Sequence, residues 1–162
     1  MDGQLQVPNP GVPPDPVLMR ALESHSLFVE GIRGGDRLML VKSSFPGVNL
    51  SGRNLIDAVL TGVDLGGANL AHVILDSADL FAANLANANL FRARLSRADL
   101  RGANLSRADM REAILEGADL RSGQLVAWVP SKREFGSRTT SLRGANLSGA
   151  SFADADVSGV DF

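Results

Sequence analysis

Apolar residues recur at every fifth position along most of this chain. From Phe45 to Leu125 each fifth residue is apolar, and 15 of these 17 residues are leucine. No leucine between Val41 and Leu125 lies outside this register. We name these apolar residues the centres of a five-residue repeat. Their regularity predicts that all of them occupy one kind of position in the fold.

Small residues accompany the centres. Of the 16 positions that lie two residues before the centres Leu50 to Leu125, 11 are alanine, from Ala58 to Ala118. The residue directly before a centre is most often Asn or Asp, as at Asn69. The pattern predicts two inward positions in each repeat, one large and one small. Between them lies an outward polar position that hydrogen-bonds a corner of the chain or its stacked neighbour.

A period of five fits neither a straight helix nor one flat strand. On an α-helix a step of five residues turns by about 140°, so the leucines would be spread around the whole surface. On a strand the side chains alternate between two faces, so an odd step would send successive leucines to opposite faces. A single buried face results only if the chain turns a corner in every repeat, which predicts a solenoid.

The repeats resemble the motif A-(D/N)-L-x-x of the pentapeptide-repeat family. Literal matches include Ala68-Asn69-Leu70, Ala78-Asp79-Leu80, Ala98-Asp99-Leu100, Ala103-Asn104-Leu105 and Ala118-Asp119-Leu120. The resemblance covers about residues 45–125 and 140–162. It implies an all-β solenoid, a right-handed quadrilateral pentapeptide-repeat β-helix with four repeats in each coil. Each centre would then stack on the centre one coil further on, in ladders that include Leu65, Leu85 and Leu105 on one face and Leu80, Leu100 and Leu120 on another.

The residues before the repeats predict a cap for the open end of such a solenoid. Residues 1–16 hold five of the seven prolines and are predicted to be a flexible leader. Residues 17–30 have a helical pattern in which Leu18, Ala21, Leu22, His25 and Val29 share a face. With a strand at 37–41, this helix makes up a predicted N-terminal cap, residues 17–41, which covers exposed core and strand edges.

The register breaks once near the C-terminal end. The uninterrupted repeats are predicted at 42–125, and an inserted loop at 126–141. A final coil follows at 142–162, with centres Leu142, Leu147, Phe152, Val157 and Phe162. An uncovered last coil with phenylalanine centres predicts either end-to-end homodimerisation through that coil or a chain that is part of a longer protein.

Composition and motifs argue against a catalytic or metal-binding site. Formal net charge is −2, from 16 basic and 18 acidic side chains, which argues against nucleic acid as a partner. There is no Cys, and His25 and His72 have no metal-ligand partner at a standard spacing. We therefore predict no catalytic residue, no metal and no cofactor. Neither a signal peptide nor a membrane span is recognisable, so we predict a cytoplasmic protein, with export by a signal-less route left open.

Departures from the repeat are the candidates for binding a partner. In the inserted loop these are Trp128, Lys132, Arg133 and Phe135, because an aromatic residue beside basic ones is typical of interface anchors. In outward positions of the solenoid they are Phe81, Phe91, Arg92, Arg94 and Arg97. Three outward isoleucines, Ile56, Ile74 and Ile114, are expected to stack on one face. The alternatives are a salt-bridged, solvated surface for the arginines and a loop that folds back onto the solenoid. For the phenylalanines and isoleucines, the alternative is cover by the N-terminal segment or single exposures without a role.

Two functions are compatible with these features. The first is a non-enzymatic protein-interaction or scaffold module whose protein partner the sequence does not identify. The second follows from a subgroup of the family whose members resemble DNA in shape and charge, bind type II topoisomerases such as gyrase, and protect them from quinolones. The rod and its loop are similar to that subgroup. The near-neutral charge and the arginine-rich later coils differ from it.

Overall fold

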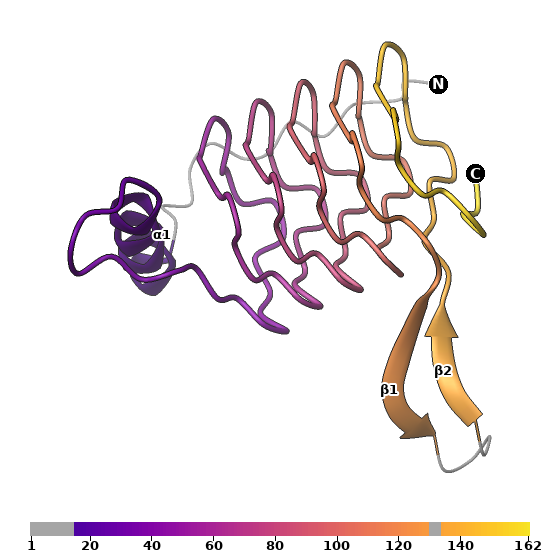
Figure 1. The fold of residues 1–162 in the computed structure, drawn as a ribbon, viewed down its shortest axis with the longest axis horizontal. Coiled ribbons are helices and arrows are strands. Elements are labelled where there is room, and N and C mark those ends of the chain that lie inside the picture. Colours follow the sequence, from indigo (N-terminus) through magenta and orange to yellow (C-terminus); the bar gives the residue numbers. More distant parts are fainter. Residues whose placement is uncertain (1–14, 130–133) are drawn as a thin grey trace, which may run out of the picture.

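The computed structural model describes residues 15–129 and 134–162. Figure 1 shows a solenoid of stacked coils, with the helix α1 (Pro16–Val29) beyond the first coil. A two-stranded hairpin, β1 (Gly123–Val129) and β2 (Glu134–Arg138), projects from the side of the later coils. The predicted all-β solenoid with an N-terminal helix is thus what the chain forms in its described parts.

Stacked positions in neighbouring coils lie 20 residues apart. Parallel bridges join Asp64 to Asn84 and Asn84 to Asn104, so four five-residue repeats complete one coil. Each centre donates to the coil that follows, as Leu85 does to the carbonyl of Asn104 at 2.7 Å, while the residue before it donates back to the preceding coil. Backbone polar groups are therefore satisfied between coils rather than within long strands. The right-handed sense of the coil stays a prediction.

The core consists of the predicted ladders. Leu65, Leu85 and Leu105 are at most 1% exposed, and the second ladder is wholly buried as well, at Leu80, Leu100 and Leu120. The alanines two residues before the centres are buried beside them. Alanine suits this position because four chain walls face one another across a narrow interior.

Each corner of the coil is a tight turn. At one such corner the amide of Ala68 donates to the carbonyl of Leu65 at 3.0 Å, and Gly67 between them has φ +67°. A positive φ at the third residue is the geometry of a type II turn. The same position, two residues after a centre, has positive φ in the solenoid except at Ser122, where the hairpin leaves the coil, and non-glycine residues such as Ser77 (φ +58°) also occupy it.

The Asn and Asp residues before the centres hold these corners, as predicted. The Oδ1 atom of Asn69 accepts from the amide of Ala71, two residues on, at 3.2 Å. The amide group of Asn84 donates to the carboxylate of Asp64 one coil away at 2.7 Å. Hydrogen bonds to the charged carboxylate, first from the amide of Gly66, lower the pKa of Asp64. These side chains therefore have a structural role.

The N-terminal helix starts one residue earlier than predicted. Asp15 is its N-cap, with Oδ1 accepting from the amide of Val17 at 2.7 Å, and Pro16 is the first helical residue. Pro16 thus belongs to α1 and not to the predicted leader, and residues 1–14 of that leader lie outside the described residues. Leu18 and Leu22 pack into the same core as the first coil.

The first repeat also begins earlier than predicted. Residues 37–41 form no separate strand of the cap. Instead, Met39 bridges to Val59 in parallel, and Leu38 and Leu40 are buried at 1% and 9% exposure. Leu40 lies five residues before Phe45, so it continues the register of the centres, and the sequence contained this information.

The interruption begins before Leu125, which was predicted to be the last centre ahead of the loop. The interval between stacked positions grows from 20 residues to 37 between Asn104 and Ser141, so 17 residues are inserted. Leu142 takes the place above Leu105, because the amide of Leu105 donates to the carbonyl of Ser141 at 2.8 Å. Leu125 lies in β1. The gain of Leu40 and the loss of Leu125 leave the number of repeats unchanged.

Candidate interaction surface

The inserted segment is a hairpin and not an irregular loop. β1 and β2 pair antiparallel, with Gly123 opposite Arg138 at the root and Val129 opposite Glu134 at the far end. Within the described residues the two strands pair only with each other. Figure 1 shows the hairpin extending away from the solenoid, so it is a projecting element.

A buried hydroxyl closes the coil where the hairpin leaves it. Thr140, which is wholly buried, occupies the small inward position two residues before Leu142. Its Oγ1 accepts from the amide of Gly102 at 2.8 Å and donates to the carbonyl of Arg121 at 2.9 Å. The interrupted coil therefore keeps its backbone partners satisfied at the root of the hairpin.

Close packing against the corners below fixes the same root. A β-carbon on Gly123 would lie 2.9 Å from the ring of Phe81 and 3.1 Å from the carbonyl of Arg101. On the other strand, the Nη1 atom of Arg138 donates to the carbonyl of Ala82 at 3.1 Å. The root thus contacts repeats that precede it by one and by two coils, which sets the direction in which the hairpin projects.

The loop candidates fall on this hairpin. The backbone register places Trp128 opposite Phe135. Lys132 and Arg133 lie outside the described residues. Their proposed role in binding a partner stays a prediction.

The outward phenylalanines are less exposed than predicted. Phe81 and Phe91 point out of the core, but both are only partly exposed. The guanidinium of Arg92 lies 4.9 Å and that of Arg111 5.4 Å from the centre of the Phe91 ring, and His72 packs edge-on against it. These are cation–π contacts within the solenoid surface. Phe91 is therefore covered by its own neighbours.

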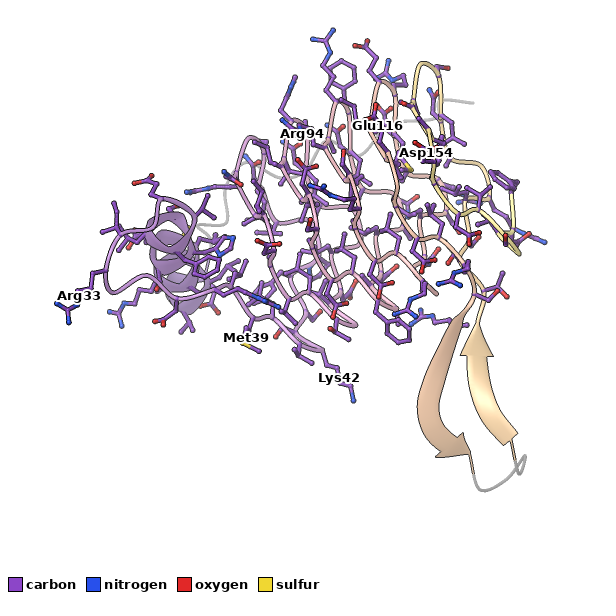
Figure 2. The ribbon with its side chains drawn as sticks, viewed as in Figure 1. Arg33, Met39, Lys42, Arg94, Glu116 and Asp154 are labelled. Atoms are coloured by element: carbon purple, nitrogen blue, oxygen red, sulfur yellow. The ribbon has the colours of Figure 1, made fainter. Side chains whose placement is uncertain are left out.

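Two of the three candidate arginines in the solenoid form ion pairs. The Nε atom of Arg92 lies 2.7 Å from Glu112, one coil away, and Nη2 of Arg94 lies 2.6 Å from the nearly buried carboxylate of Asp76. Figure 2 shows Arg94 on the side of the solenoid away from the hairpin. Arg97 is exposed. The structure does not bring these residues together with the hairpin into one site.

Asp76 is a nearly buried carboxylate that the sequence did not single out. It is only 7% exposed, and its Oδ1 accepts from the amide of Ser96 at 3.0 Å. That amide would otherwise be held by the residue before Leu95, which is Arg94 and has no acceptor. Asp76 therefore replaces the missing Asn or Asp from one coil below, which is a structural role.

Arginines pair with two of the three aspartates in the predicted column. Asp79, Asp99 and Asp119 stack in successive coils. Arg101 lies 2.6 Å from Asp99 and 3.6 Å from Asp119. Hydrogen bonding to Arg121 holds the pKa of Asp119 below its ordinary value. Carboxylates that stay charged and paired favour a structural column over acid–base chemistry.

The predicted isoleucine column is wrong. Ile74 and Ile114 do lie on one face, but Arg94 stacks between them. Ile56 lies after its centre and not before it, so it belongs to the column of Asp76. The outward face therefore offers no continuous apolar stripe at these residues.

Neither histidine has ligand geometry. The Nδ1 atom of buried His25 accepts from the amide of Leu38 at 3.0 Å, and its ring stacks on Phe28. No group of three or more His, Asp or Glu residues in the described segments is arranged to hold a metal ion. Within those segments, no helix is long and apolar enough to cross a membrane.

The last coil exposes part of its apolar side. Phe162 is 67% and Val157 is 37% exposed, whereas the equivalent centres of the middle coils are buried. The predicted end-to-end contact between two copies stays a prediction.

Parallel stacking of four-repeat coils around leucine ladders defines the chain as a β-helix solenoid built of five-residue repeats. The model of the family described as pentapeptide repeats matches residues 43–80, 54–90, 83–121 and 140–162, with eight copies. The chain therefore belongs to the pentapeptide-repeat family.

Solved structures of pentapeptide-repeat proteins are among those that match this chain. HetL of the cyanobacterium Nostoc sp. strain PCC 7120, described as involved in heterocyst differentiation regulation, is 30% identical over 77% of this chain and 55% of its own, with a TM-score of 0.30. Rfr23 of the cyanobacterium Cyanothece 51142 is 20% identical over 90% of this chain and 99% of its own, with a TM-score of 0.38. Full-length QnrB1, described as a plasmid-mediated fluoroquinolone resistance protein, is 19% identical over 72% of this chain and 71% of its own, with a TM-score of 0.27. Among curated proteins none matches significantly.

Proposed function

We propose that this chain is a non-enzymatic protein-interaction module in which the solenoid presents the β1–β2 hairpin to a protein partner. The observation that supports this most directly is the construction of the hairpin root. Where the hairpin leaves the coil, the hydroxyl of Thr140 and the guanidinium of Arg138 form hydrogen bonds to the backbone of the solenoid. Gly123 packs closely against it. A hairpin that projects from the solenoid is expected to have a role outside it.

The solenoid suits the role of a rigid support. Every repeat is tied to the coils above and below by backbone hydrogen bonds, and the interior is filled by leucine and alanine. The polar groups that could suggest catalysis are hydrogen-bonded within the repeat or paired with arginine. The Trp128 and Phe135 positions on the hairpin are the candidate anchors, with Lys132 and Arg133 favouring an acidic partner surface.

Binding to a type II topoisomerase is the second candidate. A rod with a lateral hairpin is the observation that favours it. The alternation of Arg101 and Arg121 with aspartates along one face leaves that face without the uniform negative charge of a DNA duplex. A gyrase supercoiling assay with and without a quinolone tests it. If micromolar concentrations of this protein change neither supercoiling by gyrase nor its inhibition by the quinolone, this candidate function is excluded.

The register of the repeat provides a clean test of the hairpin. Deleting residues 123–139 joins Ser122 to Thr140, which restores the five-residue spacing between Leu120 and Leu142. We expect this excised variant to keep the solenoid and its unfolding midpoint. It should lose the partners that the full chain captures, as identified by mass spectrometry.

Point variants locate the contact more finely. Trp128→Ala with Arg133→Ala should lose the same partners as the excised variant. The matched control, Arg92→Ala with Arg94→Ala, changes two arginines of the solenoid and should keep them. An excised variant that folds and captures an unchanged set of partners would exclude the hairpin as the binding element.

End-to-end contact between two copies is a separate proposal. It rests on the exposure of Phe162 and Val157 in the last coil. Light scattering at increasing concentration should show a larger assembly for the full chain than for Phe162→Asp, and equal masses of the two proteins would contradict the contact. A monomer at all concentrations for the full chain would reject it.

A further inference from the structure

The two outer edges of the hairpin differ in regularity. From Gln124 to Trp128, β1 advances four residues while β2 advances only two, from Ser137 to Phe135. Such an irregularity bends a strand and disturbs its outer hydrogen-bonding groups, which hinders the addition of another strand. The five residues of β2 contain no inserted residue. The outer edge of β2 is therefore the one suited to pairing with a further strand.

The sequence of β2 is complementary to itself. It reads Glu134-Phe135-Gly136-Ser137-Arg138, with opposite charges at its two ends. In an antiparallel pair of two such strands centred on Gly136, Glu134 of each copy stands opposite Arg138 of the other. Opposite charges at directly opposed positions stabilise a strand pair, and like charges destabilise it.

We propose that β2 pairs edge to edge with β2 of a second copy of this chain, forming a four-stranded antiparallel sheet in the order β1, β2, β2, β1. This inference rests on the proposed function, since it names a second copy as one partner of the hairpin. Unpaired backbone groups of β2 supply the hydrogen bonds, and the two Glu134–Arg138 pairs fix the register. The contact is isologous, so it closes at a dimer.

The position of the hairpin allows such a pair to form. Figure 1 shows that β2 lies on the side of the hairpin toward the C-terminal coil and that both strands extend away from the solenoid. In an antiparallel pair each hairpin tip lies beside the root of the other hairpin. The two solenoids are then at opposite ends of the sheet. Arg138 uses Nη1 on the carbonyl of Ala82, and its remaining donors are sufficient for a carboxylate.

Charge reversal tests the register directly. Glu134→Arg places arginine opposite arginine, and Arg138→Glu places glutamate opposite glutamate, twice in each dimer by symmetry. We expect each variant alone to weaken dimerisation by roughly tenfold or more, because two like-charge pairs replace two opposite-charge pairs. An equimolar mixture of the two variants restores opposite charges at both positions and should form a heterodimer. Light scattering and sedimentation at several concentrations provide the measurement.

A second measurement separates pairing from loss of folding. Hydrogen exchange at the amides of β2 should slow with rising protein concentration in the full chain and in the mixture, but not in either single variant. Phe162→Asp, which alters the last coil, should leave this dimer unchanged. Loss of the dimer in Phe162→Asp together with its survival in Glu134→Arg would overturn the proposal in favour of end-to-end stacking.

Two other results would also overturn it. One is a monomeric full chain at every concentration, and the other is a mixture of the two variants that stays monomeric. If either is found while the excised variant still loses captured partners, only the self-pairing of β2 fails. If the excised variant captures the same partners as the full chain, the proposed function itself fails.

Discussion

The side-chain oxygen of Thr140 accepts a hydrogen bond from the backbone amide of Gly102, 38 positions earlier in the chain, at 2.8 Å. Thr140 stacks on Ala103, 37 positions earlier, whereas the interval in an uninterrupted coil is 20 positions. The hydroxyl thus joins the coil that resumes after the hairpin to the coil below it. The same hydroxyl donates to the carbonyl of Arg121, two residues before the hairpin begins.

Removing this hydroxyl should destabilise the later coils. Thr140→Val keeps the shape of the side chain but leaves buried polar groups without their partner, which costs about 1–3 kcal/mol in the free energy of unfolding. Urea unfolding of the full chain measures the loss. Thr139→Val is the matched control, because Thr139 is exposed, and it should change stability by less than about 0.5 kcal/mol. Equal effects of the two substitutions would contradict this role of Thr140.

The fold was predictable from the sequence because every repeat has the same pattern of one large and one small buried residue. The inward centres and a corner in every repeat followed from spacing. The ladders followed from the four repeats in each coil that the resemblance to the family implies. The boundaries were less predictable. Leu125 obeys the register, yet it lies in β1, because Leu142 with Thr140 fits the coil and is supported by hydrogen bonds that spacing does not reveal.

Gly35 should be essential for the attachment of α1. A β-carbon at Gly35 would overlap the backbone of Leu27 and Phe28, the last turn of the helix. Gly35→Ala therefore forces the helix away from the first coil. A released helix of this length is marginal in water, so the helical circular dichroism signal should fall. Gly34→Ala is the control: it introduces strain at φ +93° but meets no atom within 4 Å, and it should keep the helix.

The left-handed corner positions predict a stabilising substitution. Ser77 has φ +58°, which costs a non-glycine residue roughly 1–2 kcal/mol. Ser77→Gly removes this strain and should raise the midpoint of thermal unfolding, although the greater freedom of glycine in the unfolded chain offsets part of the gain. Ala86→Gly, at the corner position before the left-handed one, should instead lower the midpoint. Calorimetry of both variants is the measurement, and a lower midpoint for both would contradict strain at Ser77.

The candidate site was only partly predictable, for a reason visible at Phe91 and Arg94. Spacing established that both side chains point outward, which is correct. It did not establish that Arg92 and Arg111 cover the Phe91 ring or that Arg94 pairs with Asp76. The contacts Arg111–Phe91 and Arg94–Asp76 join residues 20 and 18 positions apart, and their formation depends on side-chain reach across the corners. Outward direction alone therefore overestimates how much surface is free for a partner.

The burial of His25 predicts that the N-terminal segment around α1 becomes less stable in acid. The ring is buried, and burial lowers its pKa below the ordinary 6.5, with Asp57 opposing the shift and Arg37 adding to it. The folded chain therefore binds fewer protons than the unfolded chain as the pH falls below 6.5. By linkage, stability is fully present above 6.5 and decreases as the pH falls toward the lowered value of the folded state.

The amide of Leu38 reports this change directly, because it donates to Nδ1 of His25 at 3.0 Å, and protonation of that nitrogen removes the acceptor. We expect hydrogen exchange at Leu38 to accelerate below pH 6.5 relative to amides of the middle coils, after correction for the intrinsic pH dependence of exchange. His25→Asn, which offers an acceptor near Nδ1 without titrating, should abolish the acceleration. His72→Asn, which changes an exposed histidine, should retain it. An acceleration that persists in His25→Asn would show that other groups cause the acid sensitivity of this amide.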